Sequence, residues 1–327
     1  MPVNWSRFVD VIQSHQRFLV TSHIRPDADA LGSELGMAGI LEALGKQVRI
    51  VNGHATPPNL ATLDPEGRIQ ALETAVPANP AEDVELIMIL DTSAWAQLGP
   101  MSDVIRGSVA KRVVLDHHVG EDDLGAQFFK DTQAEAAGTL VYQAAVRLGV
   151  PLTPQIARAL FAAIATDTGW FRFSSTRSST YRVAADLVDA GVRPDRLFSE
   201  LYEQDTLSRV RLRGLILSRA VAERDGRLVH TYVLRDDFDT TGALPSDTED
   251  VINQTLTIAG TELAVILVEQ VGGGFKLSFR SRCEVDCSDL ARQFGGGGHK
   301  AAAGAFLDAP FDRAQPAVLD AVRQALQ

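Results

Sequence analysis

Short apolar runs alternate with longer segments of helical periodicity from the N-terminus to about residue 190. An apolar run of this length is typical of a buried strand, whereas apolar positions at helical spacing indicate an amphipathic helix. The expected strands are 17–22, 47–52, 86–91 and 112–116, and the expected helices are 31–45, 135–149, 154–166 and 178–190. Alternation of the two kinds of segment is typical of a parallel sheet covered by helices. We therefore predict an α/β fold for this part of the chain.

A break in this pattern divides the chain into two domains. Gly191-Val192-Arg193-Pro194 interrupts the periodicity, because glycine and proline both end regular structure. Residues 194–222 then predict a charged amphipathic connecting helix, followed by strand-like segments at 228–234, 264–269 and 275–280 and a helical segment at 247–259. We expect a first domain at 1–191, a connecting helix or linker at 192–222, and a smaller α/β domain at 223–327.

Acidic and histidine side chains follow several of the predicted elements at the point where each one stops. His23, Asp27 and Asp29 follow the first strand, Asp91 ends the third, Asp116-His117-His118 ends the fourth, and Asp167 follows the helix at 154–166. The carboxyl ends of parallel strands lie at one edge of a sheet, where open α/β sheets bind ligands. Taken singly, each residue could be a helix cap or a turn residue. Together they would place acids from four segments at one edge.

A metal site explains such a gathering. Unpaired carboxylates at close range raise one another's pKa, and a divalent cation removes that penalty. Mixed imidazole and carboxylate ligands suit Mn²⁺, Fe²⁺ or Zn²⁺ better than Ca²⁺. The six candidate ligands, His23, Asp27, Asp29, Asp91, His117 and Asp167, are more than one ion needs, so we expect two metal ions.

The second domain carries candidate anion-binding groups. Consecutive glycines allow backbone N–H groups to approach a phosphate, although they could also form a flexible hinge. Residues 300–303 are expected to open a helix behind them, whereas the glycines at 272–274 are expected to form a hairpin turn. Arginine after a strand can bind phosphate with two hydrogen bonds, or simply lie in solvent. The candidates are Gly295, Gly296, Gly297, Gly298, His299, Arg280 and Arg282.

Composition and charge limit the partners. The 327 residues are 45% hydrophobic and carry a formal net charge of −11. The apolar content excludes a disordered chain, and the negative charge argues against binding long duplexes through many phosphate contacts. The only cysteines, Cys283 and Cys287, do not form a disulfide framework, and neither a leader nor a membrane-length apolar segment is evident. We expect a cytoplasmic protein without membrane contact.

The motifs resemble those of a known family. Residues 23–33 nearly reproduce His-x-x-Pro-Asp-x-Asp-Ala-Leu-Gly-Ser, and together with Asp91, Asp116-His117-His118 and Asp167 they resemble the DHH phosphoesterase superfamily. Residues 279–282 and 295–304 resemble the associated C-terminal domain of that family. Order and spacing are similar to the NrnA-type branch of bifunctional oligoribonucleases and 3′-phosphoadenosine-5′-phosphate (PAP) phosphatases.

The resemblance implies a parallel-sheet catalytic domain, a smaller substrate-binding domain and a cleft between them. It implies two divalent ions, with Mn²⁺ expected and Mg²⁺ or Co²⁺ as alternatives. His23 and Asp27 would bind one ion, Asp29, His117 and Asp167 would bind the other, and Asp91 would bridge them. A metal-bridged hydroxide would attack the phosphate, His118 would contact the phosphate or leaving oxygen, and Asp116 would orient an imidazole. Arg280 would bind the substrate's phosphate or terminal nucleotide. Trp170, Phe171 and Phe173 could stack on a base, but ordinary packing is preferred.

The implied activity is hydrolysis of short RNA oligonucleotides to mononucleotides, of PAP to AMP and phosphate, or of both. Three alternatives stay open. These are a phosphodiesterase for linear or cyclic dinucleotides such as pApA, pGpG or c-di-AMP, an inorganic pyrophosphatase, and a non-catalytic nucleotide-binding module. The expected partners are short RNA or nucleoside bisphosphates, and a homodimer is compatible with the resemblance.

Overall fold

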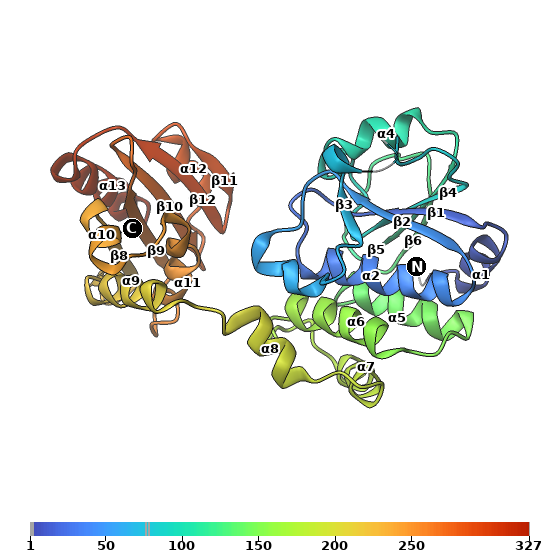
Figure 1. Ribbon diagram of the computed structural model, residues 1–327. Helices are drawn as coiled ribbons and strands as arrows, with labels where there is room; N and C mark the ends of the chain where they lie inside the picture. The colour runs from blue at the N-terminus through green and yellow to red at the C-terminus, as the bar shows by residue number, and fades with distance from the viewer. Residues whose placement is uncertain (1–2, 76, 78, 327) are drawn as a thin grey trace. The chain divides into compact units, whose positions relative to one another are not determined.

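The computed structural model describes residues 3–75, 77 and 79–326 and separates the chain into two compact units, Met1–Gln204 and Asp205–Gln327 (Figure 1). Each unit has its own sheet and its own apolar core. Both units mix helices and strands, which confirms the predicted α/β class. Within the described residues, none of the helices has the length and apolar character needed to cross a membrane.

Six parallel strands form sheet A of the first unit, in the order β3-β2-β1-β4-β5-β6. They are β1 (Arg17–Thr21), β2 (Gln47–Asn52), β3 (Ile69–Ala71), β4 (Leu86–Leu90), β5 (Lys111–Asp116) and β6 (Gln127–Lys130). The chain extends the sheet from β1 to β3 and then places β4 on the other side of β1. The carboxyl ends of β1 and β4 therefore border the crevice in which such a sheet binds ligands. All four predicted strands are present, whereas the short edge strands β3 and β6 were not predicted.

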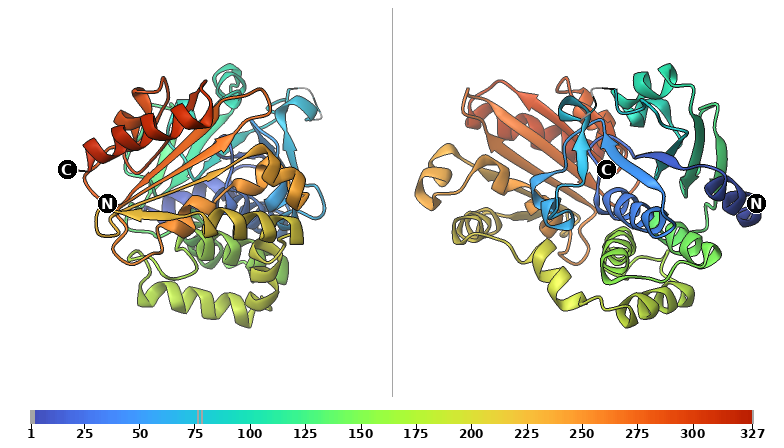
Figure 2. Two further views of the ribbon diagram at one scale, coloured as in Figure 1. Left: turned by 90° about the vertical axis from the view of Figure 1, so that its left-hand side faces the viewer. Right: turned by 45° about the vertical axis from the view of Figure 1, so that its right-hand side comes forward.

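Helices cover both faces of sheet A, because successive residues of a strand point to opposite faces. Phe18 and Val20 of β1 belong to the core on the face covered by α2, α5 and α6, whereas Leu19 belongs to the core on the α4 face (Figures 1 and 2). The helices of this unit are α1 (Trp5–Gln13), α2 (Ala28–Ala43), α3 (Trp95–Leu98), α4 (Met101–Gly107), α5 (Ala137–Leu148), α6 (Pro154–Asp167), α7 (Ser178–Asp189) and α8 (Pro194–Tyr202).

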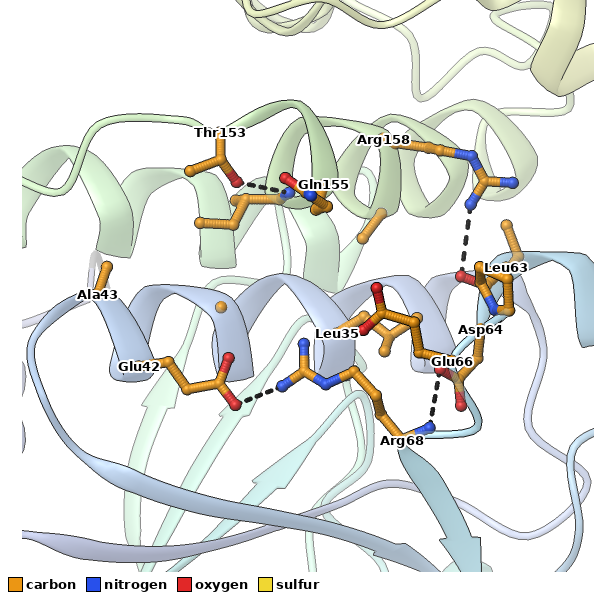
Figure 3. A pocket seen from close by; sticks show the side chains of 14 residues that line it. Leu35, Glu42, Ala43, Leu63, Asp64, Glu66, Arg68, Thr153, Gln155 and Arg158 are labelled. Carbon is orange, nitrogen blue, oxygen red and sulfur yellow. Dashed lines mark hydrogen bonds and ion pairs between the residues drawn. The ribbon is translucent and has the colours of Figure 1, made fainter.

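Helices α2 and α6 approach each other closely because glycines line their contact. A Cβ atom on Gly32 would lie 2.3 Å from the carbonyl oxygen of Ala159, and one on Gly36 would lie 2.5 Å from the side chain of Leu160. The helices run in opposite directions, so the start of α2 meets the end of α6 at the carboxyl edge of sheet A. At their other ends, both helices and the segment 63–68 line a pocket of about 480 Å³ (Figure 3).

Sheet B of the second unit has the order β11-β12-β10-β9-β8-β7, and β8 and β9 are its parallel pair. Its strands are β7 (Val221–Glu223), β8 (Leu228–Val233), β9 (Leu263–Glu269), β10 (Phe275–Ser281), β11 (Gly297–His299) and β12 (Ala302–Leu307). One face packs against α12 (Cys287–Arg292) and α13 (Phe311–Ala325), and the other packs against α9 (Leu207–Ser218), α10 (Arg235–Thr241) and α11 (Val251–Thr255) (Figure 2). The glycines at 272–274 join antiparallel β9 and β10, which confirms the predicted hairpin turn.

The helix predictions of the C-terminal half need correction. Residues 194–222 are not one helix, because α8 ends at Tyr202 and the side chain of Thr206 caps a new helix, α9. Residues 247–259 contain only the end of a short 3-10 helix and α11. Residues 300–303 do not open a helix: Ala302 begins β12, which pairs with β10 and β11. Alanine favours helix by propensity, but strand pairing and the burial of Ala303 override that preference here. The terminal helix α13 was not predicted.

Candidate metal centre

Five elements bring the six candidate ligands to the carboxyl edge of sheet A. His23 follows β1, Asp91 follows β4, and His117 follows β5. Asp27 caps α2 and Asp29 lies in the first turn of that helix, while Asp167 is the last residue of α6. The two oxygens of Asp29 also accept hydrogen bonds from the backbone N–H groups of Ala137 and Gly138, at 2.7 and 2.9 Å, so the start of α5 holds this carboxylate in place. The expected convergence at one sheet edge is therefore present.

Asp91 lies between two groups of potential ligands. Its Oδ2 is 3.4 Å from Nε2 of His23, which is in turn 3.8 Å from Oδ1 of Asp27. Its Oδ1 is 3.3 Å from Nε2 of His117. This nitrogen is also 3.8 Å from Oδ2 of Asp29 and 3.8 Å from Oδ2 of Asp167. Within each of the groups His23–Asp27–Asp91 and Asp29–His117–Asp167, one ligand atom per residue lies within 4.8 Å of the others. The geometry thus contains two potential metal sites beside one shared carboxylate, and a third group of potential ligands, Asp91, His117 and His118, overlaps them.

Both imidazoles present the same nitrogen to the cluster. Nδ1 of His23 lies 3.0 Å from the carbonyl oxygen of Ile24, and Nδ1 of His117 lies 3.1 Å from that of Ala134. A carbonyl oxygen can only accept, so Nδ1 carries the hydrogen and a neutral ring has its lone pair on Nε2. A backbone partner of this kind commonly orients a metal-ligating histidine.

Charges within the cluster depend strongly on one another. Burial opposes protonation of both imidazoles, but the close approach of the Asp91 carboxylate raises the pKa of His23 to about 9 and that of His117 to about 10. Burial raises the pKa of Asp167 to about 6, and burial together with Asp91 raises the pKa of Asp29. The protein groups alone therefore favour imidazolium–carboxylate pairs, and a cation would replace those protons.

The donor set fits divalent cations. Oδ1 of Asp91 is buried and accepts no well-aligned hydrogen bond from the described residues, although His117 is near. Asp91 also has a φ of +58°, a conformation that costs energy for a residue with a Cβ atom and is often kept at functional sites. Carboxylate oxygens and imidazole nitrogens together are suitable ligands for Mn²⁺ and similar ions.

Asp116 and His118 form a separate hydrogen-bonded pair. Asp116 is fully buried, and its Oδ1 is 2.8 Å from Nδ1 of His118. Its Oδ2 accepts a 2.6 Å hydrogen bond from Ser93 and lies 3.4 Å from Nζ of Lys130. Burial would raise the pKa of Asp116, but hydrogen bonds from His118 and Ser93 lower it to about 2. The His118 side chain is 56% exposed, and with Nδ1 engaged its Nε2 is the nitrogen left for another partner.

Sequence reasoning missed four buried polar residues behind the cluster. Glu34 accepts a 2.9 Å hydrogen bond from Asn52, whose own oxygen accepts from the backbone N–H of Ser22, next to His23. Burial raises the pKa of Glu34 to about 7. Ser93, in the loop that follows β4, donates a hydrogen bond to Asp116, and Lys130, at the end of β6, lies beside the same carboxylate. No local pattern marks these residues, because their partners come from other elements.

A cavity of about 480 Å³ opens onto this centre. His23, Asp27, Asp91, His117, His118 and Asp167 are among the residues that line it. The pocket between the far ends of α2 and α6 differs because its two arginines already have partners within the protein. Arg68 is paired with Glu42, and Arg158 donates a hydrogen bond to the carbonyl oxygen of Leu63 (Figure 3). None of the six candidate ligands lines that second pocket.

The two predicted arginines of the second unit differ in their surroundings. Arg280, on β10, lines a cavity of about 200 Å³ together with Lys276 and Ser278, and its described hydrogen bond goes to the carbonyl oxygen of Phe279. Arg282 follows the strand and donates a 2.8 Å hydrogen bond to the carbonyl oxygen of Leu256. Arg280 therefore shares a cavity with the cationic side chain of Lys276. Arg282 instead donates to the backbone of Leu256, which is a structural contact.

The tetraglycine forms part of a hairpin rather than the entrance to a helix. A Cβ atom on Gly296 would lie 2.2 Å from the carbonyl oxygen of Gly304, and one on Gly298 would lie 2.6 Å from the Cα of Ala303. These glycines therefore allow close approach to the neighbouring backbone. Gly297 and His299 are exposed on the edge strand β11, and Lys300 pairs with Glu284. A role in binding phosphate stays a prediction.

Aromatic residues after Asp167 mostly pack within the first unit. Trp170 contacts the rings of Phe198 and Tyr202 at centroid distances of 5.0 and 5.6 Å. Phe171 contacts the ring of Phe161 at 5.7 Å. The preferred reading of ordinary packing is thus confirmed for Trp170 and Phe171, whereas Phe173 is exposed.

Comparison with known proteins identifies the family. The model of the DHH family, N-terminal domain, matches residues 17–164, and the model of the DHHA1 domain matches residues 225–327. A relative from Thermus thermophilus is 32% identical over 94% of this chain and 89% of its own length. The chain belongs to the DHH family. The Thermus relative of this DHH protein is named bifunctional oligoribonuclease and PAP phosphatase NrnA.

Solved structures agree with the DHH fold. An exopolyphosphatase-related protein from Bacteroides fragilis superposes with a TM-score of 0.85 at 24% identity, covering 98% of this chain and 95% of that one. Exonuclease RecJ bound to manganese has a TM-score of 0.55 at 16% identity, covering all of this chain and 96% of the other. This chain contains an acid and histidine cluster that could bind metal.

Proposed function

We propose that this protein is a metal-dependent phosphoesterase that hydrolyses short RNA oligonucleotides from one end, PAP to AMP and phosphate, or both. The observation that carries the proposal is the position of Asp91 between two groups of ligands, each with one imidazole and further carboxylates. The name of the Thermus thermophilus relative supports these substrates. We further propose a cytoplasmic location, which is compatible with the free thiols of Cys283 and Cys287.

The proposed roles follow the two ligand groups. We assign His23 and Asp27 to one divalent ion, Asp29, His117 and Asp167 to the second, and Asp91 to both. Two such ions, with manganese expected, would lower the pKa of water and neutralise charge on the phosphoryl oxygens. The chain itself holds the ligands in place through Ile24, Ala134 and the start of α5.

His118 is proposed to act on the substrate rather than on a metal. Its Nδ1 hydrogen is directed to Asp116, so Nε2 can face the phosphate or the leaving oxygen in the cavity. A histidine held by a carboxylate in this way keeps one orientation and one tautomer. Asp116 therefore supports His118 from behind, and the imidazole donates to or accepts from the reacting group.

The second unit is proposed to hold the far part of the substrate. Arg280 and Lys276 offer two cationic groups in one small cavity, which Glu249 and Asp250 also line, and we propose that the guanidinium of Arg280 binds the phosphate. The other proposed contacts are Arg282, directly after β10, and the glycine-rich segment that leads into and forms the edge strand β11, namely Gly295, Gly296, Gly297, Gly298 and His299. A few local cations are sufficient for a short anionic ligand, whereas the net charge of −11 disfavours long nucleic acids.

The test compares substrates under one set of conditions. Purified protein with Mn²⁺ is incubated with PAP, with a 5′-phosphorylated RNA dinucleotide and with a 20-nucleotide RNA, each with and without a chelator. We expect chelator-sensitive hydrolysis of PAP, the dinucleotide or both, and much slower attack on the long RNA. Equal rates of hydrolysis of the dinucleotide and the long RNA would overturn the proposed preference for short substrates. The absence of Mn²⁺-dependent hydrolysis of every substrate would overturn the proposed phosphoesterase activity. Parallel reactions with pGpG, pApA, c-di-AMP and pyrophosphate test the alternative activities.

A further inference from the structure

Lys130 is a largely buried cation whose location the proposed mechanism does not yet explain. It is the last residue of β6, and its side chain is only 11% exposed. Its Nζ donates hydrogen bonds of 2.7 Å to Oγ of Ser93 and to the carbonyl oxygen of Gly120. It also lies 3.4 Å from Oδ2 of Asp116 and 3.6 Å from the exposed carboxylate of Glu121. A lysine is seldom so enclosed unless its charge has partners.

The hydrogen bonds around Lys130 form a chain that leads to His118. Oγ of Ser93 accepts from Lys130, and its single hydrogen can reach either Asp116 at 2.6 Å or Gly120 at 2.7 Å. Because Lys130 already donates to the Gly120 oxygen, the hydroxyl hydrogen is best used on Asp116. The other oxygen of Asp116 then accepts from both the backbone N–H and Nδ1 of His118, at 3.1 and 2.8 Å.

This arrangement balances a buried charge beside the motif. Asp116 is fully buried, and without a nearby cation its carboxylate would depend on His118 for charge compensation. The ammonium group of Lys130, 3.4 Å from Oδ2, gives Asp116 a cationic neighbour on the side away from His118. The same ammonium group holds Gly120, two residues after His118, and thereby the turn that carries the imidazole.

We propose that Lys130 is a positioning residue for the phosphoester hydrolysis, acting through Ser93 and Asp116 to hold the His118 imidazole toward the substrate. The inference rests on the proposed function of His118. It extends the machinery to a strand that the family motif does not include. Lys130 itself touches neither the six candidate metal ligands nor the exposed nitrogen of His118 in any described hydrogen bond.

The decisive experiment is a double-mutant cycle between Lys130→Met and His118→Ala, with PAP as substrate and Mn²⁺ as the metal. Outer partners of catalytic groups typically contribute about 10–100-fold, so Lys130→Met should lower kcat by that factor with little change in KM. In the His118→Ala background the same substitution should change kcat less than about twofold, because coupled residues are not additive. An equal loss of kcat in both backgrounds would overturn the proposal, since Lys130 would then act independently of His118.

Matched variants separate positioning from folding. Ser93→Ala should also lower kcat when His118 is present and change it little in the His118→Ala background. This substitution removes the hydroxyl group that links Lys130 to Asp116 but keeps the charge of Lys130. Lys111→Met removes the same charge from the exposed first residue of β5 and should leave kcat unchanged. Direct Mn²⁺ titration by electron paramagnetic resonance should give the same stoichiometry for Lys130→Met and the unsubstituted protein. Loss of Mn²⁺ binding in Lys130→Met would instead assign Lys130 to the metal centre and overturn the proposal.

A readout without substrate keeps this inference separate from the proposed activity. Long-range ¹H–¹⁵N NMR spectra report which nitrogen of each histidine carries hydrogen, and His118→Ala identifies the relevant signals. We expect the Nδ1–H form of His118 in the unsubstituted protein and a changed tautomer balance or protonation in Lys130→Met. An unchanged His118 spectrum would overturn the positioning role even if PAP is hydrolysed. If neither PAP nor the RNA dinucleotide is hydrolysed but the spectrum changes as expected, the proposed function fails and the structural link stands.

Discussion

Substitution of Asp91 by asparagine is the most direct perturbation of the proposed metal centre. Asparagine preserves the size of the side chain but removes the charge that faces both His23 and His117, at 3.4 and 3.3 Å. It also tolerates the φ of +58° at this position, whereas alanine would add backbone strain. The variant therefore tests the shared carboxylate without rearranging the end of β4.

The expected magnitude follows from the burial of Asp91, which is 2% exposed. Removing one member of a buried, charged group costs about 3–5 kcal/mol. At about 1.4 kcal/mol for each factor of ten, a loss of this size in the transition state lowers kcat/KM by about 10²–10⁴-fold. Both metal sites should weaken together, because Asp91 is assigned to both ions and lies beside one histidine of each ligand group.

The assay combines Mn²⁺ titration by calorimetry with phosphate release from PAP. Asp91→Asn should lower Mn²⁺ affinity and turnover together, and saturating Mn²⁺ should restore only part of the activity. Asp189→Asn, at the exposed end of α7, is the matched control and should behave like the unsubstituted protein. Near-normal turnover of Asp91→Asn with Mn²⁺ present would refute the assignment of Asp91 to both ions.

Three further outcomes are expected. First, burial opposes protonation, but the nearby Asp91 carboxylate outweighs it and raises the pKa values of His23 and His117 to about 9 and 10, so both rings must release protons to bind Mn²⁺ at pH 7. Mn²⁺ affinity should therefore rise toward pH 9, and calorimetry in buffers of different ionisation enthalpy should detect the released protons; pH-independent binding would contradict this. With chelator present and no metal bound, stability should change with pH in the opposite direction. Because these pKa values lie above the ordinary 6.5, the imidazolium contribution to stability is complete below pH 6.5, declines as the pH rises, and is lost by about pH 9 for His23 and about pH 10 for His117. Second, Arg280→Ala should raise KM for PAP about 10–150-fold with little change in kcat, because a charge-assisted hydrogen bond contributes about 1.5–3 kcal/mol; an unchanged KM would remove Arg280 from the phosphate site. Third, Gly296→Ala should destabilise the second unit by about 1–3 kcal/mol in urea unfolding, because its Cβ would meet the Gly304 carbonyl. Gly297→Ala is the matched control, since its Cβ would meet nothing within 4 Å, and equal stability of the two variants would contradict the packing argument.

Much of the first unit was predictable because its signals are local. The run at 86–91 is apolar at consecutive positions, as expected for a strand buried on both faces, and Asp91 marks the point where burial of apolar side chains ends. Parallel pairing then places the ends of β1, β4 and β5 side by side, which brings His23, Asp91 and His117 together. The second unit was less predictable, since residues 300–303 have helical propensity but are held as a hairpin by pairing with β10.

The chain's local patterns thus specified the four longer strands of sheet A, the class of fold and the six candidate ligands, because apolar burial and chain direction act over a few neighbouring residues. The partners of these ligands could not be read in the same way. Lys130 is associated with Asp116 through the register of β5 and β6, and Glu34 reaches the end of β1 through Asn52 on β2. Each of these contacts joins elements that meet only after the sheet has formed, so the choice of polar partners and the orientation of His118 depend on tertiary packing.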